Sequence, residues 1–308
     1  MRKYAYFEFI SPWGKLLLLI GLVIIFSILT AFGGLMIGKY WLNTDIMSLA
    51  NLISNPSTDE AINFGKFYQF LNQLGVFIFP VLLYTYLVSN SSFKYLKVNN
   101  KPQLFSILIS ITIVFSILPF LNYIAVLNMN MKLPESMSAI ENWMMQKEEQ
   151  ATLLLGAFLK TSTISGLIIN LIIIGIIPAI GEELLFRGVL LRLFKEIFKN
   201  AHIAVFISAI LFSMVHMQFY GFFPRLLLGI VLGYLFVYTK SLWAPIAYHL
   251  VNNSASVIIY YFNQKEIMET SAENFGSTDN FVLILGSLIV SVYFIFLIKK
   301  KTELTHIQ

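Results

Sequence analysis

The sequence predicts an all-α, polytopic membrane protein with about eight transmembrane helices in one bundle. Of its 308 residues, 57% are hydrophobic and 12% are charged, and the mean hydropathy is +0.76. Such a composition is far from that of a soluble globular domain. Two further observations support this fold class: the apolar segments have the length of a membrane span, and the loops between them alternate in charge.

Eight apolar windows are close to the roughly 20 residues that a helix needs to cross the hydrocarbon core of a bilayer. They lie at about 15–38, 67–88, 104–126, 163–188, 202–219, 222–239, 243–262 and 280–298. Between the third and fourth windows, residues 134–150 open with Pro134-Glu135, a favourable helix start. This segment is expected to form an amphipathic helix at the membrane interface.

The charges on the loops predict the orientation of the chain. Basic residues mark the N-terminus, every second connection and the C-terminal tail, which contains Lys299, Lys300 and Lys301. Acidic residues fill the other loops, including Asp59, Glu60, Glu148, Glu149 and Asp279. By the positive-inside rule both termini are cytoplasmic. We expect an integral protein of a bacterial-type plasma membrane.

The composition also excludes several kinds of site. The chain has no cysteine, which excludes disulfides, thiolate metal ligands and a cysteine nucleophile. No polybasic run interleaved with aromatic residues stands outside the tail, so nucleic acid is not an expected partner. The expected partners are membrane lipid and a membrane-associated peptide or protein substrate.

Three regions are predicted along the chain. Residues 1–160 form an N-terminal three-span region with the outer amphipathic segment, and residues 161–262 carry the polar groups of the candidate site. Residues 263–308 comprise an outer loop, the last span and the basic cytoplasmic tail.

Two adjacent carboxylates interrupt the fourth apolar window. A charge at the centre of a membrane helix costs about 3 kcal/mol on insertion scales, so it usually faces a protein interior or a wet cavity. Glu183 and Arg187 are one helical turn apart in the favourable acid-first order and can neutralise each other. Glu182 has no such partner, and we assign it to chemistry.

Two histidines and an asparagine fall at a matching depth on the next spans. Glu182 lies 17 residues before the turn at Lys199, and His216 lies 17 residues after it. Both are therefore about 25 Å along antiparallel helices. His249 and Asn253, four residues apart, share one face of the seventh window. His202, Asn122 and Asn170 are interpreted as structural.

A carboxylate, two imidazoles and an amide on three consecutive helices would gather in one core to avoid lipid. This set of groups fits hydrolysis of an amide bond. A carboxylate near an imidazole can hold and deprotonate a water molecule. Histidine and asparagine donors can stabilise the oxyanion that forms on the carbonyl.

The ordered motifs Glu182-Glu183-x-x-x-Arg187, Phe212-x-x-x-His216 and His249-x-x-x-Asn253 resemble those of the CAAX-processing and bacteriocin-processing (CPBP, or Abi) intramembrane proteases. The resemblance covers about residues 163–262, so that residues 161–262 would be the catalytic core, and it implies a fold similar to the type 2 CAAX prenyl protease. It further implies that Glu182, assisted by His216, activates water. His249 and Asn253 would form the oxyanion hole, while Glu183 and Arg187 brace the helix.

Whether a metal takes part is left open by the residues. Glu182, His216 and His249 can in principle supply one oxygen and two nitrogens to a zinc ion with an open fourth position. Against zinc, a His-Glu-x-x-His motif is absent, no two of these ligands share one helical turn, and a zinc-bound Glu182 would no longer be the base. We therefore favour a glutamate-dependent site without a cofactor over a zinc metalloprotease.

Three functions are compatible with the sequence. The first is an intramembrane endopeptidase that cleaves a membrane-associated protein or peptide. The second is a non-catalytic protein, such as a bacteriocin-immunity factor, that uses the same fold for binding. The third is a transporter that couples ions through the buried charges, but the absence of repeat symmetry counts against it.

Overall fold

The computed structural model describes residues 5–54, 56–268, 271 and 274–305. All regular secondary structure in this part of the chain is helical, which confirms the predicted fold class. The helices are α1 (Pro12–Trp41), α2 (Ile46–Ser54), α3 (Asp59–Gln73), η1 (Leu74–Ile78), α4 (Phe79–Val88), α5 (Ser92–Tyr95), α6 (Leu104–Ser116), α7 (Leu118–Met129), η2 (Glu135–Met137), α8 (Ser138–Leu159), α9 (Ile164–Asn170), η3 (Leu171–Ile176), α10 (Ile177–Glu183), η4 (Leu184–Leu190), α11 (Leu191–Phe198), α12 (Ala201–Met214), η5 (Phe219–Gly221), α13 (Phe222–Thr239), α14 (Trp243–Gln264) and α15 (Phe281–Thr305).

Each of the eight apolar windows coincides with a helix, but eight spans are not confirmed. Among the described residues, five helices are long and apolar enough to cross a membrane, or six if α6 and α7, bent by 45°, form one span. Helix α12 has only 14 residues, fewer than the ~20 that a span needs. Helix α14 is long enough but contains His249, Asn252 and Asn253, which lower its hydropathy.

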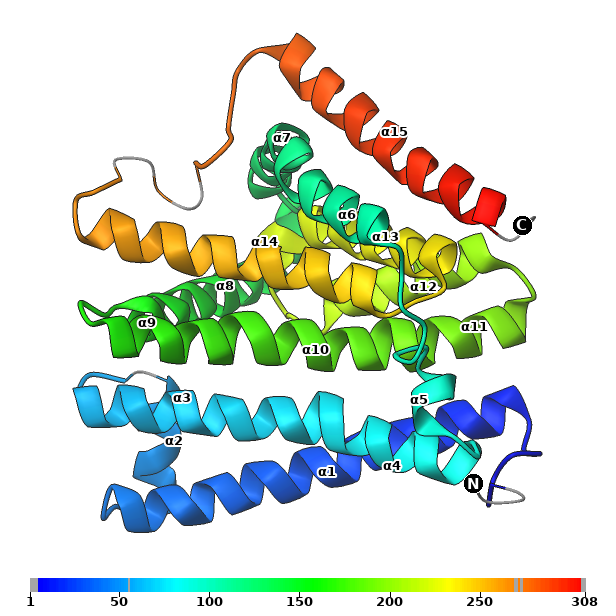
Figure 1. Ribbon diagram of the computed structural model, residues 1–308. Coiled ribbons are helices and arrows are strands. Elements are labelled where there is room, and N and C mark those ends of the chain that lie inside the picture. The colour runs from blue at the N-terminus through cyan, green and yellow to red at the C-terminus, as the bar shows by residue number, and fades with distance from the viewer. Residues whose placement is uncertain (1–4, 55, 269–270, 272–273, 306–308) are drawn as a thin grey trace.

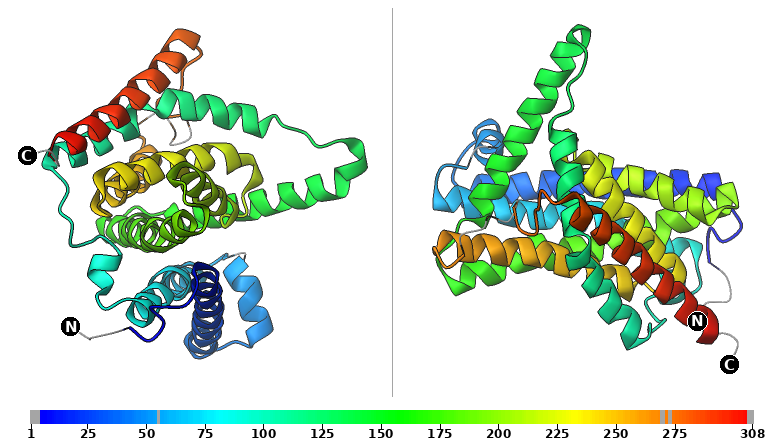
Figure 2. Two further views of the ribbon diagram at one scale, coloured as in Figure 1. Left: turned by 90° about the vertical axis from the view of Figure 1, so that its right-hand side faces the viewer. Right: turned by 90° about the horizontal axis from the view of Figure 1, so that it is seen from above.

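The helices pack in three groups (Figures 1 and 2). Helices α1 to α4 lie on one side of the long helix formed by α9, η3, α10, η4 and α11. Helices α12, α13 and α14 complete the central group, and α6, α7 and α15 cover its opposite face. Helix α1 begins and α15 ends at the same end of the bundle, as expected if both termini lie on one side of a membrane. Which side that is stays a prediction.

Small residues bring α12 and α13 into close contact. A Cβ atom added to Gly229 would lie 2.9 Å from the Cβ and 3.0 Å from the Cα of Ala209. One added to Gly233 would lie 2.8 Å from Val205. Both distances are shorter than carbon atoms tolerate, so the two helices can approach this closely only because glycine has no side chain.

A buried ion pair joins the long helix to its neighbours. The Glu183 Oε1 atom is 2.8 Å from Arg187 Nη1, and the two side chains are 0% and 1% exposed. Arg187 Nη2 also donates a hydrogen bond of 3.0 Å to the carbonyl of Gly229 in α13, and its guanidinium lies 4.6 Å from the ring centroid of Phe212 in α12. The predicted brace is therefore present, and it connects three helices.

We predict that Gly229→Ala destabilises the protein by about 1–3 kcal/mol, the usual cost of overpacking. The added methyl group meets the backbone of Ala209 as well as its side chain, so a side-chain rotation cannot relieve the clash. Gly286→Ala is the matched control, because a Cβ atom there meets nothing within 4 Å. Thermal unfolding in detergent micelles measures both variants, and equal unfolding temperatures would contradict the close packing described above.

We also predict that Glu183→Gln destabilises the protein by about 3–5 kcal/mol, because it leaves the buried Arg187 without its counter-charge. The control is Glu196→Gln, which breaks a pair of the same i,i+4 spacing. Arg192 and Glu196 are 3.5 Å apart but 37% and 35% exposed, and such pairs contribute about 1 kcal/mol or less. A similar loss of stability in both variants, measured by thermal unfolding, would argue against a special role for the buried pair.

Candidate functional site

Glu182 occupies the centre of the long helix, between two π-helical stretches. Helix α10 holds it, with η3 before and η4 after. π-helical turns inside α-helices occur frequently at functional sites. The side chain is buried, and its Oε2 atom has no hydrogen-bond partner among the described residues. A buried carboxylate oxygen without a partner is costly, so this atom is available for a substrate or a water molecule.

His216 reaches Glu182 from the segment that follows α12. Its Nε2 atom is 4.0 Å from Glu182 Oε2, which confirms the depth match between the two residues. Its Nδ1 atom is 2.8 Å from the carbonyl of Phe212. A carbonyl only accepts hydrogen bonds, so Nδ1 carries the proton, and in the neutral imidazole Nε2 is a proton acceptor that faces Glu182.

His249 approaches the same carboxylate from α14. Its Nε2 atom is 3.9 Å from Glu182 Oε2, and its Nδ1 atom donates to Glu183 Oε1 at 2.9 Å. Glu183 therefore orients His249 in addition to pairing with Arg187, a role that the sequence motifs did not show. The ring of Phe212 packs edge-on against both imidazoles, with centroid distances of 5.2 Å to His216 and 5.8 Å to His249.

Asn253 lies one turn after His249 but makes a structural contact. Its Nδ2 atom donates to the carbonyl of Ile174 at 3.2 Å. That carbonyl is four residues before Pro178, which has no N–H group to bond with it. Close packing supports the contact, because a Cβ atom on Gly175 would lie 2.8 Å from Ser254 Oγ. The role of Asn253 in an oxyanion hole stays a prediction.

Three residues expected to be structural have structural contacts. Asn170 donates to the carbonyl of Leu159, and Asn122 donates to the carbonyl of Phe275. His202 is exposed and pairs with the Tyr234 hydroxyl at 2.8 Å.

A cavity of about 340 Å³ opens at Glu182 and His216 and is lined on its other side by α3. Helix α3 contributes Gln69, Asn72 and Gln73, and the Gln73 Oε1 atom is buried without a hydrogen-bond partner among the described residues. The sequence analysis did not single out these amides. Their i, i+3, i+4 spacing within an apolar span places all three on one helical face. That spacing could have predicted a polar surface on this helix.

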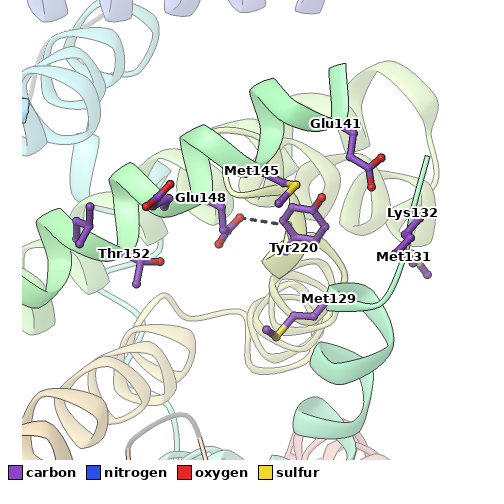
Figure 3. A pocket seen from close by; sticks show the side chains of 10 residues that line it. Met129, Met131, Lys132, Glu141, Met145, Glu148, Thr152 and Tyr220 are labelled. Atoms are coloured by element: carbon purple, nitrogen blue, oxygen red, sulfur yellow. Dashed lines mark hydrogen bonds between the residues drawn. The ribbon is translucent and has the colours of Figure 1, made fainter. Parts of the chain in front are cut away.

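A second cavity, of about 460 Å³, lies under the amphipathic helix α8 and does not include the Glu182 cluster (Figure 3). Its lining includes Met145 and Glu148 of α8, Met129 of α7 and Tyr220. Glu148 accepts hydrogen bonds from the Tyr220 backbone and from Gln218. Helix α8 is thus attached to the loop that follows His216, which orders the segment carrying that histidine.

The three side chains that were expected as possible zinc ligands lie close together. Within the described ranges, no group of three or more His, Cys, Asp or Glu side chains is placed to hold a metal ion. Glu182, His216 and His249 converge, with each Nε2 about 4 Å from the carboxylate oxygen, and the bond from His249 Nδ1 to Glu183 leaves its Nε2 free to act as a ligand. That the site works without a metal stays a prediction.

Three groups of the cluster lie close to one another. The Glu182 carboxylate and His216 Nε2 can accept protons, and the His249 imidazole is held in place by Glu183. A water molecule between Glu182 Oε2 and His216 Nε2, which are 4.0 Å apart, would contact both acceptors. The His249 Nε2 atom is 3.9 Å from the same carboxylate oxygen. It can donate a hydrogen bond when both ring nitrogens of His249 carry a proton.

Comparison with known families gives a match, and it covers the segment that carries the site. Residues 164–255 match the family model described as Rce1-like, type II CAAX prenyl endopeptidase Rce1-like. No curated protein and no solved structure matches the chain. The matched segment, which is less than a third of the sequence, contains all seven motif residues from Glu182 to Asn253. The match suggests CAAX-type intramembrane protease activity, and over residues 164–255 it confirms the resemblance to the CPBP family.

Proposed function

We propose that this protein is an intramembrane endopeptidase that hydrolyses a peptide bond of a membrane-associated protein or peptide. The observation that carries the proposal is the convergence of His216 and His249 on the unpartnered Glu182 carboxylate, at 4.0 and 3.9 Å. Three ionisable groups from separate segments meet inside a bundle of apolar helices. If Glu182 only held helices together, we would expect its carboxylate to have partners, as Glu183 Oε1 has Arg187 and His249.

In the proposed mechanism, Glu182 and His216 hold the attacking water. Glu182 removes one proton as the water oxygen attacks the scissile carbonyl carbon, and the carbonyl oxygen becomes an oxyanion. The charged His249 donates a hydrogen bond to that oxyanion through Nε2, while Glu183 holds Nδ1. The proton on Glu182 then passes to the leaving amine as the carbon–nitrogen bond breaks, and the carboxylate is restored.

Asn253 is proposed as the second oxyanion donor. Its amide has two N–H groups and the Ile174 carbonyl occupies one, so the other remains for substrate. The position one turn from His249 is compatible with a shared oxyanion. A small rotation of α14 or of the side chain on substrate binding would complete the pair.

The amides of α3 are proposed to hold the main chain of the substrate. Gln69, Asn72 and Gln73 face Glu182 and His216 across the cavity, and side-chain amides can both donate to and accept from peptide groups. In an apolar environment an extended peptide needs such partners for its own N–H and C=O groups. This arrangement would place the scissile bond next to the catalytic carboxylate.

We predict that Glu182→Gln lowers the rate of peptide cleavage by about 10²-fold or more, because the amide cannot accept the proton of water. The assay incubates purified protein with a peptide library embedded in liposomes and identifies products by mass spectrometry. Glu196→Gln, a carboxylate on the same long helix away from the cavity, is the control. Processing that survives intact in folded Glu182→Gln would favour the non-catalytic, immunity-type function.

We also predict that cleavage does not depend on a bound metal ion. Metal analysis of the purified protein should show less than stoichiometric zinc, and activity should survive treatment with a strong chelator, because Glu182 serves as the base. Loss of activity on chelation and its recovery with added zinc would instead identify Glu182, His216 and His249 as ligands.

A further inference from the structure

Helix α3 carries a lysine inside the bundle, remote in sequence from the protease motifs. Lys66 is 7% exposed and lies in the candidate span Asp59–Val88. Lysine is almost never buried without a partner. In a membrane helix its long side chain usually extends to the interface and exposes the ammonium group.

Lys66 has no ion pair or hydrogen bond with any residue that the structure describes. The acidic residues nearest to it in sequence, Asp59 and Glu60, are six or seven positions earlier, in the exposed first turn of α3. Burying an ammonium group without a counter-charge costs several kcal/mol. Lys66 therefore has no counter-charge among the described residues, and its side chain lines a cavity where an anion from outside the chain can reach it.

The lysine faces a cavity of about 540 Å³ between the end of α1, α3 and the first half of the long helix. Apart from Lys66 and Asn63, the side chains that line this cavity are apolar, and they include Trp41, Phe70 and Ile172. Such a cavity suits a molecule with one anionic group and an extensive apolar part. A free inorganic anion would leave most of the apolar lining without a partner.

A tryptophan at the end of a candidate span lines the cavity. Trp41 is the last residue of α1, and its ring lies 5.7 Å from that of Phe64, two residues before Lys66. Tryptophans near the ends of spans commonly mark the level of the headgroups. On the other wall, Ile169 and Ile172 are 46% and 39% exposed, so the cavity is continuous with the lipid-facing surface of the long helix.

We propose that this cavity binds the headgroup of an anionic phospholipid. Lys66 pairs with the phosphate, Asn63 supplies a further polar contact, and an acyl chain runs along Ile169 and Ile172. The site is distinct from the cavity at Glu182, and its existence does not depend on protease activity. A bound lipid there would fill the space between α3 and the long helix.

The test measures lipid retention by native mass spectrometry of the delipidated protein in detergent. The probes are phosphatidylglycerol, phosphatidylcholine and inorganic phosphate. Wild-type protein should bind one phosphatidylglycerol in preference to phosphatidylcholine, and Lys66→Met should weaken that binding by about 10- to 100-fold, the loss expected for a charged hydrogen bond. Lys66→Arg should retain most of the affinity.

Lys160→Met is the matched control. Lys160 is an exposed lysine at the end of α8, so its loss tests general attraction between lysines and anionic lipid. The proposal is overturned if Lys66→Met binds phosphatidylglycerol as wild type does, if Lys160→Met loses as much affinity, or if phosphatidylcholine binds equally well. Displacement of the lipid by inorganic phosphate at the same concentration would assign the site to a free anion and would also overturn the proposal.

Discussion

The structure depends on one shared oxygen atom, Oε1 of Glu183. It accepts from Arg187 at 2.8 Å and from His249 at 2.9 Å, and so binds a guanidinium from its own helix and an imidazole from α14. Because Arg187 also reaches the Gly229 carbonyl in α13, one buried carboxylate fixes three helices relative to each other. The cost of burying these charges is offset only when all of the contacts form together.

The two neighbouring carboxylates have different surroundings. Glu183 is bonded through Oε1 to Arg187 and His249, whereas Glu182, about 100° away round the helix, lines a cavity. The long helix departs from regular α-helical geometry around Glu182. π-Helical stretches lie on either side of α10, and Asn253 donates to the Ile174 carbonyl. A span that is otherwise apolar thus carries a buried acid at its centre.

Helix α3, which belongs to the N-terminal region, lines the cavity at Glu182 with polar side chains. The sequence motifs lie between Glu182 and Asn253, and they assign nothing to residues 1–160. In the structure, Gln69, Asn72 and Gln73 complete the cavity opposite Glu182, while Lys66 faces a separate cavity at the end of α1. Both cavities lie between α3 and the long helix, so α3 lines both proposed sites in addition to packing in the bundle.

The sequence by itself determined the all-helical membrane class and the Glu183–Arg187 pair, because hydropathy and i,i+4 spacing are local properties of the chain. It also determined the common depth of Glu182 and His216, since equal helix lengths on either side of a tight turn fix that depth. Only the tertiary structure decided that His249 is bonded to Glu183, that Asn253 is engaged with Ile174 and that α3 lines the cavity. Those outcomes depend on the rotation and tilt of helices distant in sequence, which side-chain packing sets and no local pattern records. The number of spans also depends on tertiary structure, because neighbouring helices can surround a short α12 and a polar α14 within the bundle.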